Sequence, residues 1–492
     1  MPSEQELIEL RRQKREQLLA LGDAYPARTS RTHEAAKAVA LFERTEREGL
    51  EESRRAVTVA GRVTAIRDMG RAAFVDLRDG SGGIQLHVRR NVLGDQFGLL
   101  ALVDLGDFVE ASGRLFRTRH GEVTVAVTRW RVLTKALRPP PEKWAGLVDV
   151  ETRYRQRHLD LMANERSREI ARARSEVLAA VRRFFQRRGF MEVETPVLQE
   201  EAGGAAARPF YTHHGALDRD LALRISLELH LKRLVIGGFD KVFEIGRVFR
   251  NEGISHRHNP EFTLLESYEA YADYEDVANM VEALFRSVLS EVTGGLEVRH
   301  GEETIDLGEP WARTTYREAL LEHTGIDYRA HPEAAQVRTL ALDRGVEVDP
   351  DASWGTALDA LMAAFVEPHL VHPTFVFDYP AELSPLAKRK RDDPTLAERF
   401  ELFALGIERA NAYSEQNDPV EQRELLREQA RKAAGGDEEA EVADEDFVRA
   451  LEQGMPPAGG LGVGIERLVM LVTGEHSIRE VVLFPAMRES GG

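Results

Sequence analysis

The sequence predicts an α+β protein in which a small β-barrel precedes a larger domain built on an antiparallel sheet flanked by helices. Residues 57–137 consist of short alternating segments, such as VTVAGRV and EVTVAVTRWRVL, separated by Gly and Asp turns, which is the pattern of strands. Beyond Tyr154, long helical patterns are grouped with strand-like runs that show no regular β-α-β alternation. These two sequence patterns indicate two domains.

The N-terminal part divides into an arm and a barrel. Residues 1–54 form the predicted arm, whose first helix carries Ile8 among basic residues such as Arg11 and Lys14. We expect the basic side of this helix to be solvated surface. Residues 55–138 supply about five strands in about 80 residues, which fits a small Greek-key barrel of the oligonucleotide-binding type, the OB-fold.

A proline run marks the boundary between the domains. Pro139, Pro140 and Pro141 exclude a helix and favour an extended spacer, so a linker is predicted at 139–152. The second domain, 153–492, contains a mostly helical stretch at about 315–367 that we expect to be an insertion. Its strand-like runs include KVFEIGRVFR, EFTLLESYEAY, TFVFDYP, FELFALGIERANAYSE and VVLFP.

Composition excludes several classes of protein. The 492 residues are 42% hydrophobic and 30% charged and include no cysteine, which excludes disulfide frameworks, Cys-ligated zinc, iron–sulfur clusters and cysteine nucleophiles. The net charge of -17 argues against a wholly basic nucleic-acid binder but is compatible with local basic surfaces. No apolar run is long enough for a membrane span or signal peptide, so we expect a cytoplasmic protein with no membrane partner.

The common nucleotide and metal motifs are absent, because GSGGIQ and GLGVGIER lack the GxGxxG spacing and neither a P-loop nor HExxH occurs. What remains is a set of Arg, Glu and aromatic residues on predicted strands. The two-residue period of EFTLLESYEAY places Phe262, Glu266 and Tyr268 on one face, and Arg250 precedes this strand in a predicted hairpin. Alone, such a set is more often a group of surface ion pairs than a site.

Three motifs resemble those of the class II aminoacyl-tRNA synthetases. They occur in the family's order: a helix followed by GFMEVETPVL (motif 1, about 175–198), RVFRNEGISHRHNPEFTLLE (motif 2, about 243–266) and GLGVGIER (motif 3, about 459–472). The strings GGAAARPF, LHLKRLVIGGFDKVFEIGR, DYPAELSPLAKR and NAYSEQND are similar to those of the bacterial lysyl-tRNA synthetases, a family of subclass IIb. The resemblance covers essentially the whole chain.

The resemblance implies an OB-fold anticodon-binding domain followed by a class II catalytic domain, in a homodimer. The implied reaction joins L-lysine and ATP to lysyl-adenylate and pyrophosphate, and then transfers lysine to the 3′-terminal adenosine of tRNA(Lys) for protein synthesis. Mg²⁺ is the implied cofactor. This chemistry requires in-line positioning and neutralisation of phosphate charge, and it requires no protein nucleophile.

The resemblance also implies roles for the nucleotide-site residues. Arg250 is implied to be catalytic, holding the α-phosphate beside the amino-acid carboxylate. Phe262 and Arg467 would enclose the adenine. The implied ATP-binding residues are Arg250, Glu252, His258, Asn259, Phe262, Glu401, Glu408 and Arg467.

The implied metal ligands are Glu401 and Glu408, which bracket a turn containing Gly406, so that a hairpin would bring their carboxylates together. Mg²⁺ prefers few carboxylates together with phosphate oxygens and water, which suits such a pair. Asn411 does not share strand parity with Glu408, so both reach ligands only if a β-bulge or strong twist lies between them.

The chain departs from the family pattern in two strings. FELFALGIERAN lacks a glycine pair and has Ile407 and Arg409 in exchanged order, and ISLELHL replaces an apolar or proline-containing run. Glu401 and Glu408 keep their expected spacing, so we expect the exchange to alter outward packing more than ligand binding.

Lysine specificity follows from charge. A buried ammonium is costly unless it is paired, so a lysine pocket should contain more acids than the substrate has cations. The resemblance implies that Glu228 and the Gly204 backbone bind the α-ammonium and that Asn411 binds the carboxylate. Glu415 would bind the ε-ammonium. The implied lysine-binding residues are Gly204, Glu228, Glu266, Tyr268, Asn411, Tyr413 and Glu415.

The OB-fold domain is implied to read the anticodon by stacking single-stranded bases on an aromatic ring and hydrogen-bonding their edges. Phe74, Gln85 and Glu122 match the positions used for the central uridine in this subclass. Local positive charge would come from Arg62, Arg67, Arg71, Arg89 and Arg90.

Two other functions stay open. A paralogue that attaches lysine to a protein would resemble the catalytic domain alone, and residues 57–137 argue against it. The main alternative is a catalytically silent or regulatory tRNA-binding paralogue. The presence of Arg250, Glu401, Glu408 and Arg467 argues against that alternative.

Overall fold

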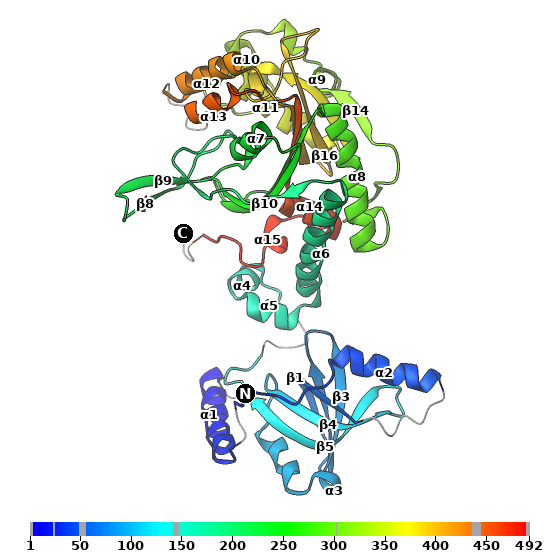
Figure 1. Ribbon diagram of the computed structural model, residues 1–492. Helices are drawn as coiled ribbons and strands as arrows, with labels where there is room; N and C mark the ends of the chain where they lie inside the picture. The colour runs from blue at the N-terminus through cyan, green and yellow to red at the C-terminus, as the bar shows by residue number, and fades with distance from the viewer. Residues whose placement is uncertain are drawn as a thin grey trace. The chain divides into compact units, whose positions relative to one another are not determined.

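The computed structural model describes residues 3–22, 25–48, 56–140, 147–301, 303–434 and 444–488. The chain divides into two compact units, Met1–Val148 and Asp149–Gly492 (Figure 1). The predicted boundary between residues 54 and 55, and residues 141–146 of the predicted linker, lie outside the described residues. The expected fold class, a β-barrel followed by a largely antiparallel sheet with helices, is confirmed.

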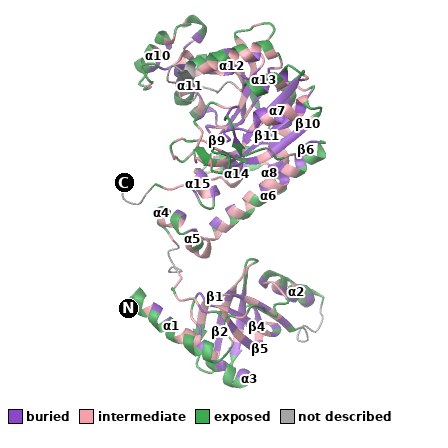
Figure 2. Ribbon diagram, turned by 60° about the vertical axis from the view of Figure 1, so that its left-hand side comes forward, coloured by how far each residue is buried: buried purple, intermediate pink, exposed green. Residues whose placement is uncertain are grey.

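The first unit is a closed five-stranded barrel with strand order β1-β2-β3-β5-β4. Only β3 and β5 pair in parallel. Valine and leucine side chains alternate inward along the strands and fill the interior. Figure 2 colours many residues of these strands as buried. The elements are α1 (Glu4–Ala20), α2 (Ala35–Arg47), β1 (Ala56–Asp68), β2 (Ala72–Arg78), β3 (Gly83–Arg89), α3 (Arg90–Leu93), the 3-10 helix η2 (Gly94–Leu102), β4 (Phe108–Arg117) and β5 (Val123–Thr134).

The basic side of α1 packs onto the barrel, so the expectation of a wholly solvated face is wrong. Arg11 is buried, and its Nη1 donates to three backbone carbonyls at distances between 3.0 and 3.2 Å. Lys14 forms an ion pair with Asp104 at 2.7 Å. These basic groups therefore hold α1 in place.

The second unit is built on an eight-stranded sheet with order β14-β15-β16-β17-β18-β11-β10-β6. The pairs at its two ends, β14 with β15 and β10 with β6, are parallel, and the pairs between them are antiparallel. The strands of this sheet are β6 (Met191–Glu192), β10 (Lys241–Phe249), β11 (Glu261–Ala270), β14 (Ala312–Thr315), β15 (Thr374–Pro380), β16 (Leu396–Ala404), β17 (Ile407–Ser414) and β18 (Ala458–Gly464).

Smaller sheets and helices complete this unit. The small strands are β7 (Leu198–Gln199), β8 (Tyr211–His214), β9 (Arg219–Leu223), β12 (Glu297–His300) and β13 (Glu303–Asp306). The helices outside the insertion are α4 (Val150–Arg155), α5 (Arg157–Ala163), α6 (Glu165–Arg187), α7 (Glu228–Ile236), α8 (Tyr274–Thr293), η5 (Ala381–Leu383), α12 (Pro419–Ala434), α13 (Glu445–Leu451), α14 (Ile465–Thr473) and α15 (Ile478–Val481). No helix in the described ranges is both long and apolar enough to cross a bilayer.

The two faces of the large sheet have different coverings. Helices α6, α8 and α14 cover one face and form the main core with it, in which Leu265 of β11 is fully buried (Figure 1). Leu264 and Tyr268, of opposite strand parity, pack instead in a second core with α7 and α13. The second face is therefore the one that presents Glu266 and its neighbours.

The stretch between β14 and β15 folds around a small core of its own. Its helices are α9 (Tyr316–Thr324), η3 (Tyr328–Ala330), α10 (Ala334–Asp343), α11 (Trp354–Phe365) and η4 (Glu367–His369). Tyr316, Leu320 and Leu358 are fully buried in this core, which also includes residues of β15 and β16. The helices predicted at about 315–367 therefore pack directly against the large sheet.

The predicted strand at VVLFP is wrong. Helix α15 ends at Val481, and the residues that follow form no strand. Arg157 explains the difference, because its buried guanidinium donates to the carbonyls of Arg479, Val482 and Leu483 at 2.7 to 3.1 Å. These carbonyls accept from a side chain in place of a neighbouring strand.

Candidate active site

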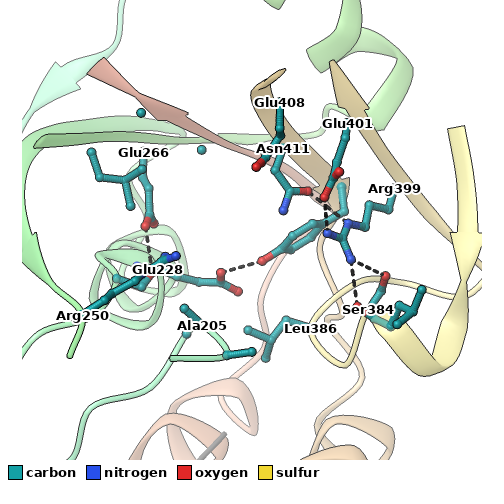
Figure 3. A pocket seen from close by; sticks show the side chains of 18 of the residues that line it. Ala205, Glu228, Arg250, Glu266, Ser384, Leu386, Arg399, Glu401, Glu408 and Asn411 are labelled. Atoms are coloured by element: carbon teal, nitrogen blue, oxygen red, sulfur yellow. Dashed lines mark hydrogen bonds and ion pairs between the residues drawn. The ribbon is translucent and has the colours of Figure 1, made fainter. Parts of the chain in front are cut away.

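A cavity of about 670 Å³ lies on the open face of the large sheet (Figure 3). The catalytic-domain residues singled out in the sequence all line it, with the exception of Glu415. They come from the β10–β11 hairpin and its loop, the β16–β17 hairpin, the segment between β7 and β8, α7 and the start of α14. Segments far apart in the chain thus converge on one space.

The floor of the cavity is set by the register of three strands. Two rows of paired residues cross β11, β18 and β17: Glu266–Gly462–Asn411 and Tyr268–Gly460–Tyr413. A glycine of the motif 3 string stands in the middle of each row. The large polar side chains of β11 and β17 therefore flank a central strand, β18, that has no side chains at these positions.

Gly460 could not be another residue in this arrangement. A Cβ atom there would overlap the Glu415 carboxylate and approach within 2.7 Å of the Tyr268 ring. Gly204 is restricted as well, because its φ is +87° and a Cβ would lie 3.1 Å from both Glu228 and Ser226. Both glycines let chain segments approach the buried acids closely.

The acids at one end of the cavity are buried and hydrogen-bonded. Glu266 accepts from the Ser226 hydroxyl at 2.7 Å, the Leu227 N–H at 3.0 Å and the Tyr268 hydroxyl at 3.1 Å. The Glu228 carboxylate accepts from the Tyr413 hydroxyl at 2.5 Å. We call this end, defined by Glu228, Glu266, Tyr268, Asn411, Tyr413 and Glu415, the acidic end.

Lys232 is a member of the acidic end that sequence reasoning missed. Its side chain is fully buried, and its ammonium forms ion pairs with Glu228, at 2.6 Å, and with Glu415. Glu415 is 1% exposed and lies behind the cavity wall, held by this lysine. Glu228 and Lys232 stand four residues apart on α7, so a helix predicted over this segment would have paired them.

Burial and mutual repulsion shift the titration of these acids. Burial raises the pKa of Glu266 to about 7, and the nearby Glu228 adds to the shift. The pKa of Glu415 is also raised by burial, against the attraction of Lys232. The acidic end therefore holds carboxylates that are costly to ionise until a further cation arrives.

The β16–β17 hairpin carries Glu401 and Glu408 and contains the predicted bulge. The register shifts between Leu402, paired with Ala410, and Phe403, paired with Glu408, so Arg409 is the extra residue. The bulge lets Glu408 and Asn411 both line the cavity, which confirms the irregularity that the sequence required.

Arg409 does not pack outward, so that expectation was wrong. It is 2% exposed, its Nε donates to the Ala404 carbonyl at 3.1 Å, and its Nη1 donates to the Arg467 carbonyl at 2.7 Å. Burial, with Arg467 and Arg257 nearby, lowers the pKa of Arg409 to about 9. The bulge turns this side chain inward toward α14.

Glu401 and Glu408 are electrostatically unequal. Burial raises the pKa of Glu401 to about 7, with Arg399 opposing the shift and Glu408 adding to it. Burial would also raise the pKa of Glu408, but its ion pair with Arg467 at 2.6 Å prevails and holds that pKa below its usual value. Two carboxylates at this point thus repel one another, as a cation-binding pair should.

The other end of the cavity contains two arginines, Arg250 and Arg467. Arg250 follows β10, donates from Nε to the Ile225 carbonyl at 3.3 Å, and has its guanidinium carbon 5.2 Å from the centre of the Phe262 ring. Arg467 enters from the first turns of α14. We call this end, defined by Arg250, Glu252, His258, Phe262, Glu401, Glu408 and Arg467, the arginine end.

The loop between β10 and β11 is braced from within. Ser255 accepts from the backbone N–H of His258 at 3.0 Å, and the backbone N–H of Glu252 donates to the Arg250 carbonyl at 2.8 Å. The buried Asn259 uses its side-chain amide on the backbone, donating to the Glu261 carbonyl at 2.6 Å. Asn259 lines the cavity mainly as a brace of this loop.

Two further cavity residues were missed. Arg399 of β16 contacts both Asn411 and Glu401 (Figure 3). Asp359 of α11 lines the cavity near Arg399, and desolvation of its carboxylate raises its pKa. Neither residue belongs to a quoted motif, and an isolated charge on an amphipathic element gives no sequence signal of its own.

The anticodon residues predicted in the barrel lie on one outer face. Gln85 of β3 donates to the Glu122 carboxylate at 2.6 Å. Phe74 of β2 pairs across the ladder with His87, and the two rings stack at 4.6 Å between centroids. A ring and two hydrogen-bonding groups are therefore close together on adjacent strands.

Known protein families match both units. Residues 149–488 match the family described as tRNA synthetases class II (D, K and N), and residues 57–133 match the OB-fold nucleic acid binding domain. The first match spans well over half of the chain and contains every residue of the cavity.

Curated relatives match nearly the whole chain. A lysine–tRNA ligase of Dehalococcoides mccartyi is 52% identical, with 94% of each chain covered. Those of Pelotomaculum thermopropionicum and Bacillus subtilis are 49% and 47% identical, and cover 99% and 98% of this chain and 96% and 97% of their own. With both domains matched in order, the chain belongs to the class II tRNA synthetases and, within them, to the lysine–tRNA ligase family.

Proposed function

We propose that the cavity carries out both steps of lysine–tRNA ligation, the activity of the family to which the chain belongs. ATP and L-lysine would form lysyl-adenylate and pyrophosphate, and the lysyl group would then pass to the 3′-terminal adenosine of tRNA(Lys). The observation that carries the proposal is the division of one cavity into an acidic end and an arginine end. One end suits a diamine and the other a triphosphate.

Charge balance supports lysine as the substrate of the acidic end. The three carboxylates of Glu228, Glu266 and Glu415 carry up to three negative charges, and Lys232 neutralises one. Two charges remain, which matches the two ammonium groups of lysine. An aspartate or asparagine side chain would leave one of these buried charges without a partner, and that is a costly arrangement.

Individual contacts can be proposed from the residues that line the cavity and from Glu415, which lies behind its wall. Glu228 and the Gly204 backbone bind the α-ammonium, with Glu266 contributing charge. Tyr268 and Glu415 bind the ε-ammonium, for which one buried Glu415 oxygen, Oε1, has no hydrogen-bond partner in the described chain. An unpartnered buried acceptor of this kind favours a cationic ligand.

Arg250 is the proposed catalytic residue. Its guanidinium lines the cavity near Glu408 of the arginine end and Glu266 of the acidic end, where the lysine carboxylate must approach the α-phosphorus. A half-buried cation there offsets the repulsion between two anions and stabilises the extra charge on the phosphoryl oxygens in the transition state. No protein nucleophile takes part.

The rest of the arginine end would bind ATP. Phe262 and Arg467 stack on the adenine, Glu252 accepts from its amino group, and His258 with Arg467 contacts the outer phosphates. Phe262 and Arg250 already form a cation–ring contact, which helps to position the Phe262 ring before ATP binds.

Glu401 and Glu408 fit Mg²⁺. They are the close carboxylate pair of the arginine end, and Glu408 helps to raise the pKa of Glu401, so a divalent cation would relieve the repulsion. Such an ion typically takes one or two carboxylates, phosphate oxygens and water. When bound, Mg²⁺ would neutralise phosphate charge.

The barrel would bind the anticodon of tRNA(Lys). Phe74 offers a stacking surface, while Gln85 and Glu122 offer a donor and acceptors to a base edge. A homodimer is also proposed through the motif 1 segment, where Met191, Val197 and Leu198 are 40%, 38% and 47% exposed. A molar mass of one chain in solution would exclude that dimer.

The decisive experiment is ATP–pyrophosphate exchange with each of the twenty amino acids separately. We expect exchange with lysine, and the release of charged tRNA(Lys) when tRNA is added. Exchange with aspartate or asparagine but not lysine would overturn the specificity, and no exchange with any amino acid would favour the silent tRNA-binding paralogue.

A further inference from the structure

Arg399 has no role in the function proposed above, although it lines the cavity where the acidic and arginine ends meet. It lies on β16 two residues before Glu401, so both side chains point from the same face of the strand. Its α-carbon pairs across the ladder with that of Tyr413. The strand thus places a guanidinium beside residues of both ends.

Each nitrogen of this guanidinium has a different partner (Figure 3). Nε donates to Asn411 Oδ1 at 3.1 Å, and Nη2 donates to Glu401 Oε1 at 2.5 Å. Nη1 donates to the Leu383 carbonyl at 2.8 Å and to the Ser384 hydroxyl at 3.1 Å. One side chain therefore links a β17 amide, a β16 carboxylate and the η5 loop.

The contact with Asn411 decides which end of that amide meets a ligand. An amide has an acceptor oxygen and a donor nitrogen, and here the oxygen is occupied by a cationic donor. Asn411 also lines the cavity, so its free NH₂ group is the one available there. A donor suits a carboxylate and would not bind an ammonium.

The contact with Glu401 orients a carboxylate in the same way. Oε1 accepts from Arg399, and Oε2 accepts from the Tyr379 hydroxyl at 2.9 Å. The Arg399 guanidinium lies over the Tyr379 ring, with its carbon 4.6 Å from the ring centre. Both oxygens are thus fixed in direction, and each keeps a lone pair.

We propose that Arg399 is a positioning residue that couples the lysine-carboxylate donor Asn411 to the magnesium carboxylate Glu401. This inference rests on the proposed function, because it uses the ligands assigned there to the two groups. Arg399 holds the two groups at one spacing. Loss of the Arg399 guanidinium frees the Asn411 amide to turn its oxygen toward the cavity. The same loss removes a hydrogen-bond donor that orients Glu401.

Lysine cannot replace arginine in this role. An ammonium is a compact point charge on a flexible stem, whereas the guanidinium is a planar fork that serves several acceptors at fixed angles. Arg399→Lys would keep a positive charge near Glu401 and lose the simultaneous hold on Asn411. This variant thus separates the effect of the positive charge of Arg399 from the effect of its hydrogen-bond geometry.

The test is ATP–pyrophosphate exchange by the full-length chain, with lysine, Mg²⁺ and ATP varied in turn. For Arg399→Gln we expect the lysine KM and the half-saturating Mg²⁺ concentration each to rise about tenfold, as for lost hydrogen bonds to charged groups, with the ATP KM within about twofold. For Arg399→Lys we expect the rise in lysine KM alone. Arg391→Gln, at an exposed arginine of the preceding loop, is the matched control and should change neither.

A double-mutant cycle with Asn411→Ala completes the experiment. Adding Arg399→Gln to Asn411→Ala should raise the lysine KM by less than twofold further, because the shared interaction is already lost. The proposal would be overturned if the effects of the two substitutions on the lysine KM multiplied. It would also be overturned if Arg399→Lys had a normal lysine KM and a normal half-saturating Mg²⁺ concentration, or if Arg399→Gln changed the melting temperature but no KM value. Absence of lysine-dependent exchange in the unaltered chain would instead refute the proposed function.

Discussion

The two ends of the cavity solve opposite electrostatic problems. At the acidic end the charges are buried, with Lys232 and Glu228 side chains 0% and 5% exposed, and they are already paired with one another. At the arginine end the pair of Arg467 and Glu408 is 24% and 34% exposed. The buried and paired charges of the acidic end discriminate between ligands by the number of positive charges that a ligand carries. The more exposed charges of the arginine end bind an anion that arrives with its own counterion.

Removing Arg250 should break the arginine end most severely. Arg250→Ala removes the cation at which transition-state charge develops, so we expect the rate of adenylate formation to fall about 10³-fold. Single-turnover measurement of lysyl-adenylate would show this loss. Lysine binding measured by calorimetry without ATP should stay within a few-fold, and equal losses in binding and rate would contradict the division of roles.

Glu415→Gln tests the acidic end. Loss of one partner of a buried charge pair is expected to cost enough to raise the lysine KM about 100-fold, while the ATP KM changes little. Exchange assays with either substrate varied would separate the two constants. Equal weakening of lysine and ATP would show that Glu415 acts on the whole fold, and a thermal scan of the variant with saturating lysine provides the control.

Phe74→Ala separates the barrel from the cavity. Stacking of one base on an aromatic ring is worth a few kcal/mol at most, so we expect kcat/KM for tRNA charging to fall about tenfold. ATP–pyrophosphate exchange needs no tRNA and should stay unchanged. A parallel fall in both activities would remove the anticodon role.

An effect of similar size to that of Phe74→Ala is expected in the pH dependence of the lysine KM. The pKa of Glu266 is about 7 because of burial, and the ionised form binds ammonium, so protons and lysine compete below that pH. We expect the lysine KM to rise about tenfold between pH 8 and pH 6. Glu266→Gln should raise the KM at pH 8 and abolish this slope, and an unchanged slope in that variant would assign the titration elsewhere.

Strand periodicity made much of the site predictable. The parity of Phe262, Glu266 and Tyr268 followed from the two-residue period, and the conflict between Glu408 and Asn411 required a bulge that the hairpin contains. These inferences succeeded because each concerns neighbours on one strand or hairpin, where backbone geometry alone relates the side chains.

Residues whose partners lie on other elements were not predictable. Arg399 contacts the η5 loop and β17, and the direction of Arg409 depends on which residue of its hairpin bulges. VVLFP has the composition of a strand, but Arg157, more than 300 residues earlier, binds its carbonyls. Contacts between distant segments of this kind leave no local periodicity in the sequence.

The bulge at Arg409 also fixes the length of β17. By adding one residue, it reverses the alternation of the strand between Glu408 and Asn411, so that a metal-binding and an amino-acid-binding segment share one continuous backbone. Shortening the strand by that residue would point every side chain on one side of the deletion toward the opposite surface. A substitution in this strand changes one side chain at the site. A one-residue deletion would instead leave the metal-binding and the amino-acid-binding residues facing opposite surfaces of the sheet.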